Sequence, residues 1–272
     1  MIYIATHKHC VRPMHDMFQR VWLGRKDPPE GYISDENGNR FFKNQRNFAE
    51  VSALFYMSNV QEDLQGLFHY RRYFAFENRI LNKVVTESEF DEVAAGYKIP
   101  EAILKKLGRN YIVRPRRVSY YHSIHNTLCK ILSVDDMHIM YKVMYQLYPD
   151  VRSTVEDYMF RNNKMSCCNM FIANGEFCKS YVEWVTPIFD NLLKQVHISS
   201  YPVPSRIFGF LSEALMDIYI SHKGYKVSYV PLLIGRDDLS SDSLLKYCVR
   251  YLRNEFSHQI NMPRKINYEN YS

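Results

Sequence analysis

Short apolar segments that stop abruptly at polar or cationic residues recur along this 272-residue chain and alternate with helical segments. The first, Ile2–Ala5, leads into Thr6-His7-Lys8, and another, Gln65–Phe68, leads into His69-Tyr70-Arg71-Arg72. Apolar runs of this length are typical of buried strands. Strands that alternate with helices predict an α/β fold, with a mixed, mostly parallel sheet flanked by helices.

Periodicity predicts the remaining elements. The clearest helix has apolar residues from Ile207 to Tyr219 at spacings of three and four, which form a continuous stripe. A capping box at Asn47–Glu50 predicts a helix start there. Ser133 is a suitable N-terminal cap between two further helices. We also expect helices at 151–164, 176–195 and 243–255, strands at 111–113, 167–172 and 225–233, and a loop at 24–46. Residues 1–235 then form one domain, followed by a basic, partly helical tail at 236–272.

Composition describes an ordinary globular protein, with 46% hydrophobic and 24% charged residues. The net charge of +6 suits an anionic partner without choosing among nucleic acid, anionic lipid and phosphorylated substrate. The six cysteines form no Cys-x-x-Cys motif, so we expect reduced thiols. The N-terminus is too polar for a signal peptide, and no apolar run approaches a membrane span of about 18–20 residues. We therefore expect a cytoplasmic protein whose contact with the inner face of the cell membrane, if any, is peripheral.

The polar residues that follow the strands are candidates for ligand binding. In open α/β sheets, ligands bind outside the carboxyl ends of the strands, where Thr6-His7-Lys8, His69–Arg72 and Asn169 would converge. Arginine guanidinium groups match phosphate oxygens in bidentate geometry. The alternative is that both arginines pair with internal carboxylates such as Glu50. Within a strand, Arg71 and Arg72 would point to opposite faces, and only one would face a ligand.

Two carboxylates lie beside the apolar stripe of the clearest helix. Arg206, Glu213 and Asp217 have i, i+7 and i+11 spacing and align on one side of it. Either carboxylate is a candidate general base if partial burial raises its pKa, and a solvated flank is the simpler alternative. Tyr121 is expected to line a cleft or the core. His122 and His125 share a helix face but lack a nearby third ligand, so no metal site is predicted.

Five ordered segments resemble the DUF4422 family: 2–8, 47–55, 66–74, 168–172 and 206–213. The most specific of them is His-Tyr-Arg-Arg-Tyr-Phe at 69–74, and the resemblance extends over about residues 1–235. It implies a GT-A-like (Rossmann-like) fold and a glycosyltransferase acting in bacterial capsule, exopolysaccharide or O-antigen synthesis. It also implies a nucleotide-sugar donor and a lipid-linked glycan acceptor, and some members of the family are regarded as galactofuranosyltransferases.

The resemblance and the residues together give a mechanistic hypothesis. No Asp-x-Asp motif follows a predicted strand, so fixed cations would offset the donor diphosphate, and metal dependence stays open. The donor site combines Thr6, His7 and Lys8 near the nucleoside with His69, Arg71 and Arg72 at the diphosphate. Glu213 deprotonates the acceptor for inverting transfer, with Asp217 as second candidate and His69 as a further catalytic candidate. Asn169 and Tyr121 hold sugar or acceptor. A basic tail containing Arg250, Arg253, Arg264 and Lys265 would contact an anionic membrane.

Three alternatives remain open on sequence grounds. A retaining hexopyranosyltransferase would use the same donor. A nucleic-acid-binding protein would use Arg114–Arg117 for phosphates and Tyr120-Tyr121 for base stacking. A non-catalytic glycan-binding protein would bind sugars without transferring them.

Overall fold

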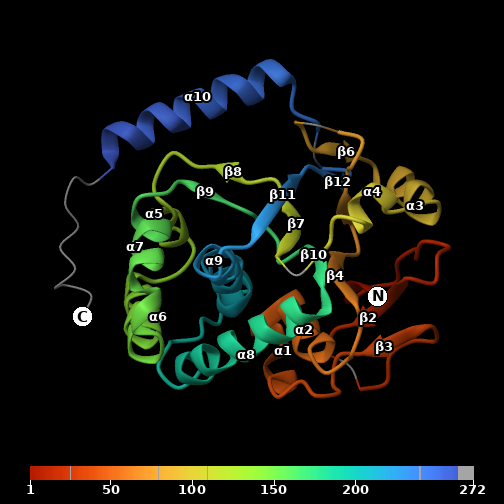
Figure 1. The fold of residues 1–272 in the computed structure, drawn as a ribbon, viewed down its shortest axis with the longest axis horizontal. Coiled ribbons are helices and arrows are strands. Elements are labelled where there is room, and N and C mark those ends of the chain that lie inside the picture. Colours follow the sequence, from red (N-terminus) through yellow and green to blue (C-terminus); the bar gives the residue numbers. More distant parts are fainter. Residues whose placement is uncertain (25, 79, 109, 239, 263–272) are drawn as a thin grey trace.

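A seven-strand path forms the spine of the molecule, which is a computed structural model that describes residues 1–24, 26–78, 80–108, 110–238 and 240–262. Along this path the strand order is β11-β7-β10-β4-β1-β2-β3 (Figure 1). Every pairing along it is parallel except those of β10, which runs antiparallel to β4 and β7. The bounds are β1 (Ile2–Thr6), β2 (Phe18–Trp22), β3 (Tyr32–Ser34), β4 (Leu64–His69), β7 (Tyr111–Pro115), β10 (Phe171–Asn174) and β11 (Lys226–Val230).

Three short strands extend this sheet from β4. β5 (Arg72–Phe74) pairs with β4 and with β12 (Leu232–Gly235), and β12 also pairs with β6 (Lys83–Val85). Separately, β8 (Val118–Ser119) and β9 (Lys164–Met165) form a two-stranded ribbon.

Helices cover both faces of the sheet (Figure 1). Because side chains alternate across a strand, Tyr3, Ala5 and Leu67 face one apolar core while Ile2 and Phe68 face the other. The larger core packs against α1 (Gln45–Phe48), α2 (Ser52–Met57), α5 (Ile124–Leu128), α6 (Val134–Leu147), α7 (Arg152–Phe160), α8 (Gly175–Leu192) and α9 (Ile207–His222). The smaller core lies under α3 (Glu87–Ala95) and α4 (Glu101–Leu104). α10 (Leu244–Asn261) runs apart from both cores, and short 3-10 turns span Phe42–Asn44, Ala49–Val51, Pro149–Val151 and Pro204–Arg206.

The strand directions bring distant segments to one edge of the sheet. The parallel strands β1 and β4 end there at Thr6 and His69, and β7 ends there at Pro115. β10 runs the other way, so its beginning at Phe171 lies at this same edge, just after Asn169. The predicted α/β fold with a mostly parallel sheet flanked by helices is thus confirmed.

Several local predictions were wrong, each for a physical reason. The capping box at Asn47–Glu50 does not form, because α1 begins at Gln45 and Asn47 lies inside it; Asn47 Nδ2 donates to the carbonyl of Ser205, at 2.8 Å. The strand expected at 167–172 begins only at Phe171, because Cys168 has a left-handed φ of 68° that no strand accommodates.

Other boundaries moved. The segment 24–46, predicted as a loop, contains the strand β3. β3 pairs in parallel with β2, and β2 was not predicted either. The late strand at 225–233 is two strands, because Pro231 between them has no N–H to donate to a sheet. The predicted cap at Ser133 forms and accepts a backbone N–H in the first turn of α6; Asn174, which had not been predicted as a cap, does the same for α8. None of the helices in the described ranges is long and apolar enough to cross a membrane.

Candidate active site

The Tyr70-Arg71 turn carries the cationic sequence that marks this chain. β4 ends at His69, β5 begins at Arg72, and these two residues pair directly across the hairpin. Tyr70 N donates to the Ala5 carbonyl at 3.2 Å, which holds the turn. Strand alternation therefore does not separate the arginines, because Arg71 lies in the turn and Arg72 opens the next strand.

Burial, together with the neighbouring positive charges, keeps the imidazole of His69 neutral. Burial lowers the pKa of His69 well below its usual value, and the positive charges of Arg72 and Arg71 lower it further. Arg72 Nη1 lies 3.4 Å from His69 Nδ1, a contact suited to an unprotonated ring nitrogen. His69 is thus available to accept or donate a hydrogen bond, while the two arginines supply the fixed charge.

Of the three residues at the end of β1, His7 and Lys8 contact the Tyr70-Arg71 turn, while Thr6 shapes the backbone before it. The His7 ring lies edge-on to Tyr70 at 5.2 Å, and burial together with the nearby cations lowers the pKa of His7. Lys8 Nζ lies 5.0 Å from the centre of the Tyr70 ring but also pairs with Glu87 at 3.2 Å. The buried Thr6 hydroxyl bonds to the backbone of Lys8 and shapes the turn.

Glu213 has a strongly perturbed carboxyl group on α9. Cys168 N donates to Glu213 Oε1 at 2.9 Å. Burial raises the pKa of Glu213 to about 8, and the negative charge of Glu50 contributes in the same direction. The Cys168 N–H and the positive charges of Arg114 and Arg72 oppose the rise without cancelling it. A carboxyl that titrates near neutral pH in the same charge cluster as Arg72 is suited to proton transfer.

Glu50, which we had considered only as a partner for Arg71 and Arg72, instead links three elements. Its Oε2 lies 3.2 Å from Arg206 Nη2, and its Oε1 accepts from Asn169 Nδ2 at 3.3 Å. Asn169 is fully buried, and its Nδ2 also donates to the Gly209 carbonyl at 3.3 Å. The side-chain oxygen of Asn169 is buried with no hydrogen-bond partner in the described part of the chain.

Two strained residues adjoin these side chains. Ala49 has φ 51° and Cys168 has φ 68°, and both are non-glycine residues in the left-handed region. They immediately precede Glu50 and Asn169 in sequence. Such conformations cost about 1–3 kcal/mol each and cluster at functional sites. The strain therefore marks the Glu50–Asn169 contact as a position that the surrounding fold imposes.

Asp217 is not brought to this group. It is 1% exposed, and Arg114 donates to its Oδ1 from Nη2 at 2.9 Å and from Nε at 3.3 Å. Tyr158 Oη and Ser166 N donate to its other oxygen, at 2.9 Å and 3.1 Å. A carboxylate with four donors is fully engaged, and its role here is structural.

Tyr121 also points elsewhere. Its side chain is exposed, and its ring contacts His122 edge-on. Its neighbour Tyr120 is directed toward the site, with its hydroxyl 2.9 Å from Cys167 Sγ. Nothing in the sequence distinguished the two tyrosines. Across the described residues, no three His, Cys, Asp or Glu side chains gather as a metal-binding group.

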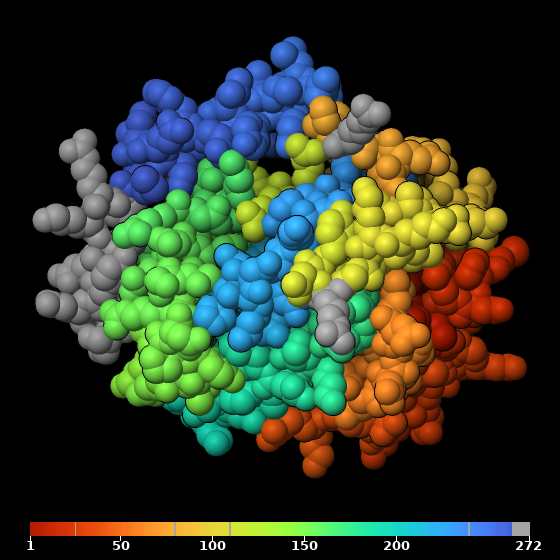
Figure 2. Space-filling model, in the orientation of Figure 1, coloured from red at the N-terminus to blue at the C-terminus, as the bar shows by residue number. Residues whose placement is uncertain are grey.

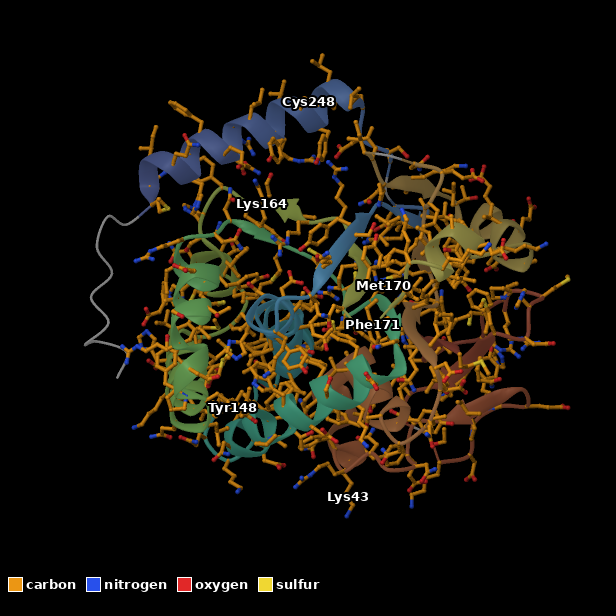
Figure 3. All side chains as sticks on the ribbon, in the orientation of Figure 1. Lys43, Tyr148, Lys164, Met170, Phe171 and Cys248 are labelled. Atoms are coloured by element: carbon orange, nitrogen blue, oxygen red, sulfur yellow. The ribbon has the colours of Figure 1, made fainter. Side chains whose placement is uncertain are left out.

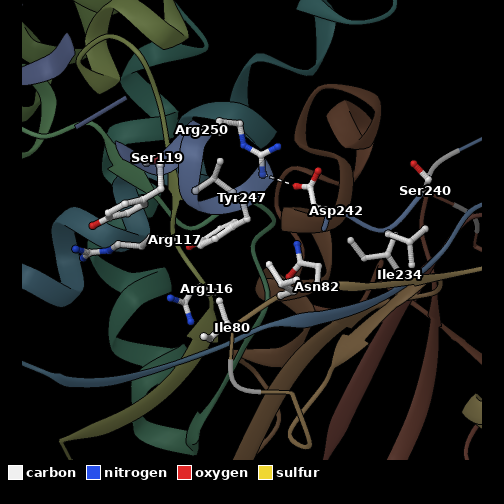
Figure 4. A pocket seen from close by; sticks show the side chains of 14 residues that line it. Ile80, Asn82, Arg116, Arg117, Ser119, Ile234, Ser240, Asp242, Tyr247 and Arg250 are labelled. Atoms are coloured by element: carbon white, nitrogen blue, oxygen red, sulfur yellow. Dashed lines mark hydrogen bonds and ion pairs between the residues drawn. The ribbon is translucent and has the colours of Figure 1, made fainter. Parts of the chain in front are cut away.

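A pocket of about 320 Å³ opens at the same edge of the sheet, beneath α10 (Figure 4). Arg116 and Arg117 enter it just after β7, and Tyr247 and Arg250 enter it from α10. Arg117 stacks over the ring of Tyr229 with 4.7 Å to the centroid. Arg250 pairs with Asp242, which also lines the pocket. Ile234 of β12 lines the pocket and pairs with Arg72 of β5, so the pocket and the Tyr70-Arg71 turn border the same short strands.

Comparisons with known proteins agree with this architecture. The apo structure of WbbM, described as a bifunctional glycosyltransferase, matches with a TM-score of 0.74 and 20% identity, over 86% of this chain and 45% of that chain. This chain therefore spans less than half of WbbM, and the likeness shows a shared GT-A-like α/β fold. None of the curated proteins matches. A model of the domain of unknown function DUF4422 matches residues 1–224, and the chain belongs to the DUF4422 family.

Proposed function

We propose that this protein is a glycosyltransferase that moves a sugar from a UDP-sugar donor to a lipid-linked glycan acceptor. The observation that carries the proposal is that Arg72 acts both on a carboxyl whose pKa is raised to about 8, Glu213, and, together with Arg71, on His69. Group transfer from a nucleotide sugar needs both features, because a diphosphate leaves and an acceptor hydroxyl must lose its proton. The fold shared with WbbM supports the same reaction class.

The reaction proceeds as an inverting displacement. The Glu213 carboxylate takes the proton of the acceptor hydroxyl, whose oxygen bonds to the anomeric carbon while the bond from that carbon to the diphosphate oxygen breaks. UDP departs with the bonding electrons, and Arg71 and Arg72 stabilise the developing negative charge. Neutral His69 donates a hydrogen bond to the same diphosphate. Loss of transfer in Glu213→Gln with UDP binding intact is expected.

The remaining predicted contacts complete the donor site. His7 and Lys8 lie beside the Tyr70 ring, where a nucleoside can stack. Asn169, which is fully buried, helps to hold the sugar indirectly by fixing Glu50, and Tyr121 contacts the acceptor from its exposed position. Galactofuranose is one candidate for the transferred sugar, in bacterial capsule, O-antigen or exopolysaccharide synthesis. A retaining hexopyranosyltransferase would yield the opposite anomer, which NMR of the product distinguishes.

The acceptor side of the proposal uses the pocket beneath α10. Arg116 and Arg117 offer charge for the phosphate of a lipid carrier, in a pocket that Ile234, the strand partner of Arg72, also lines. The basic residues Arg250 and Arg253 of the tail would meet an anionic membrane surface. Arg264 and Lys265, which belong to the same predicted tail, lie outside the described residues.

A thermal-shift screen against UDP, UDP-hexopyranoses and UDP-galactofuranose tests the donor site. We expect stabilisation by UDP itself and loss of that shift in the double variant Arg71→Ala/Arg72→Ala. Lys105→Ala, which removes an exposed cation at the C-terminal end of α4, is the control and should retain the shift. An equal UDP shift in wild type and the double variant would contradict the diphosphate role. Steeply salt-dependent RNA binding without any nucleotide shift would favour the nucleic-acid alternative.

A further inference from the structure

α10 has its polarity reversed with respect to the protein. A surface helix normally turns its apolar stripe toward the core and its polar face toward water. The residues of α10 that are buried are Asn254 and Ser257, both polar. Figure 1 shows α10 running along one edge of the molecule, and Figure 2 shows a hollow between it and the body below.

Polar contacts attach the inner face of α10. Asn254 Nδ2 donates to the Ser119 carbonyl at 2.8 Å. Lys164 Nζ lies 2.7 Å from the Glu255 carboxylate and 2.9 Å from Tyr251 Oη. The helix is therefore held by hydrogen bonds and an ion pair, and burial of its own apolar side chains contributes little to that attachment.

The outer face is an apolar stripe. Its residues recur at spacings of four, three, four and four, so they share one side of the helix. One exposed apolar side chain is ordinary, but five on one face are not: Leu245 is 75% exposed, Val249 58%, Leu252 66%, Phe256 67% and Ile260 65%. Cys248 projects from the same side, away from the body of the molecule (Figure 3). A contiguous exposed apolar stripe of this kind marks a surface that another phase or molecule covers.

Charge along the helix identifies what covers the stripe. Lys246, Arg250 and Arg253 are exposed on α10, although Arg250 also pairs with Asp242, while the acidic residue Glu255 of the helix is turned inward onto Lys164. A second copy packed stripe to stripe would bring like cations together, which is unfavourable. An apolar stripe flanked by cations is the pattern of a helix that lies in the plane of an anionic bilayer.

We propose that α10 inserts its apolar stripe into the interface of an anionic membrane and lies parallel to the bilayer. Side chains of such a helix reach about 5–10 Å into the boundary between headgroups and acyl chains. The pocket lined by Arg116, Arg117 and Tyr247 then opens at headgroup level, directly beneath the helix. This step rests on the proposed function, since it places the phosphate of a lipid-linked acceptor beside the donor site.

Vesicle co-sedimentation of the full chain tests the insertion. We expect wild type to sediment with vesicles of phosphatidylcholine and phosphatidylglycerol at 3:1, and more weakly with phosphatidylcholine alone. Leu252→Glu/Phe256→Glu should reduce partitioning about a hundredfold or more, because two large apolar side chains lose their burial. Val93→Glu/Val134→Glu is the matched control, since it adds the same charge at two separate exposed apolar positions. Both variants should keep the wild-type melting temperature.

The outcomes separate this inference from the proposed function. Wild type that binds neither vesicle, or a stripe variant that binds like the control, would overturn the inference. A wild-type dimer that the stripe variant abolishes, without vesicle binding, would show that a second copy covers the stripe. UDP stabilisation, measured on the same proteins without lipid, reports the donor site alone and should survive in the stripe variant.

Discussion

The raised pKa of Glu213 makes stability depend on pH in a way that one substitution removes. The folded state holds this proton up to a pKa of about 8, while the unfolded chain releases it near 4.5. Between these values the native state binds more protons than the unfolded state, so stability falls as pH rises. Glu213→Gln keeps the shape of the side chain and cannot ionise.

The size of the effect follows from the two pKa values. From pH 6 to pH 9, linkage predicts that ionisation of Glu213 costs wild type about 2 to 3 kcal/mol of folding stability. For a chain of this length that corresponds to a Tm lower by about 5–10 °C. The melting temperature of Glu213→Gln should therefore exceed that of wild type by more as the pH is raised. The same substitution should abolish transfer activity, because the base is gone.

The assay is thermal unfolding by circular dichroism at pH 6, 7, 8 and 9. The control is Glu183→Gln, which neutralises an exposed carboxylate on α8 and should follow wild type at every pH. The difference in Tm between Glu213→Gln and wild type must grow with pH and level off above about 8. A constant difference, or one that shrinks toward pH 9, would refute a raised pKa at Glu213.

Other predictions test the remaining contacts. If Glu213 is the base, transfer by wild type should rise about tenfold from pH 7 to a plateau near pH 9, because about a tenth of the carboxyl is ionised at pH 7; a flat profile would remove it as the base. Arg72→Ala should weaken UDP binding about 10- to 100-fold by titration calorimetry, through loss of a charge-assisted hydrogen bond. Asp217→Asn should destabilise the fold by about 3–5 kcal/mol in urea titrations, because Arg114 keeps a buried charge without its counter-charge; a loss under 1 kcal/mol would contradict this. Ala49→Gly should raise the free energy of unfolding, measured by urea titration, by about 1 kcal/mol, because φ 51° with ψ −130° suits glycine.

The sequence predicted β1, β4 and β7, whose apolar runs are local signals, and the edge of the sheet at which these parallel strands end. It could not show that Glu213 and Asp217 differ, although both lie on the same side of α9. The difference between the two carboxylates comes from Arg114. Side-chain alternation in β7 turns Arg114 toward α9, where it pairs with Asp217. That contact joins residues 103 positions apart, beyond the reach of any spacing argument.

The role of Glu50 was missed for a similar reason. Its segment was interpreted as a helix cap, whereas the backbone at Ala49 turns sharply and sends the carboxylate toward Arg206 and Asn169. The left-handed backbone at Ala49 and Cys168 could not be predicted, because neither residue is a glycine, the residue type that usually indicates this conformation. Tyr120 and Tyr121 likewise have identical chemistry, and only the Tyr120–Cys167 contact separates them.

The contacts of Glu50 also have a consequence for folding. They join Asn169 and Arg206, which lie 119 and 156 residues further along the chain, and Cys168 meets Glu213 from 45 residues away. Contacts this distant in sequence close late, after the entropy of long loops has been lost. The cluster therefore serves as a sensor of complete folding: an intermediate or a truncated chain that lacks α9 would retain much of the sheet and have no Glu213 and no partner for Glu50. Sugar transfer, which needs Glu213, would then report finished molecules alone.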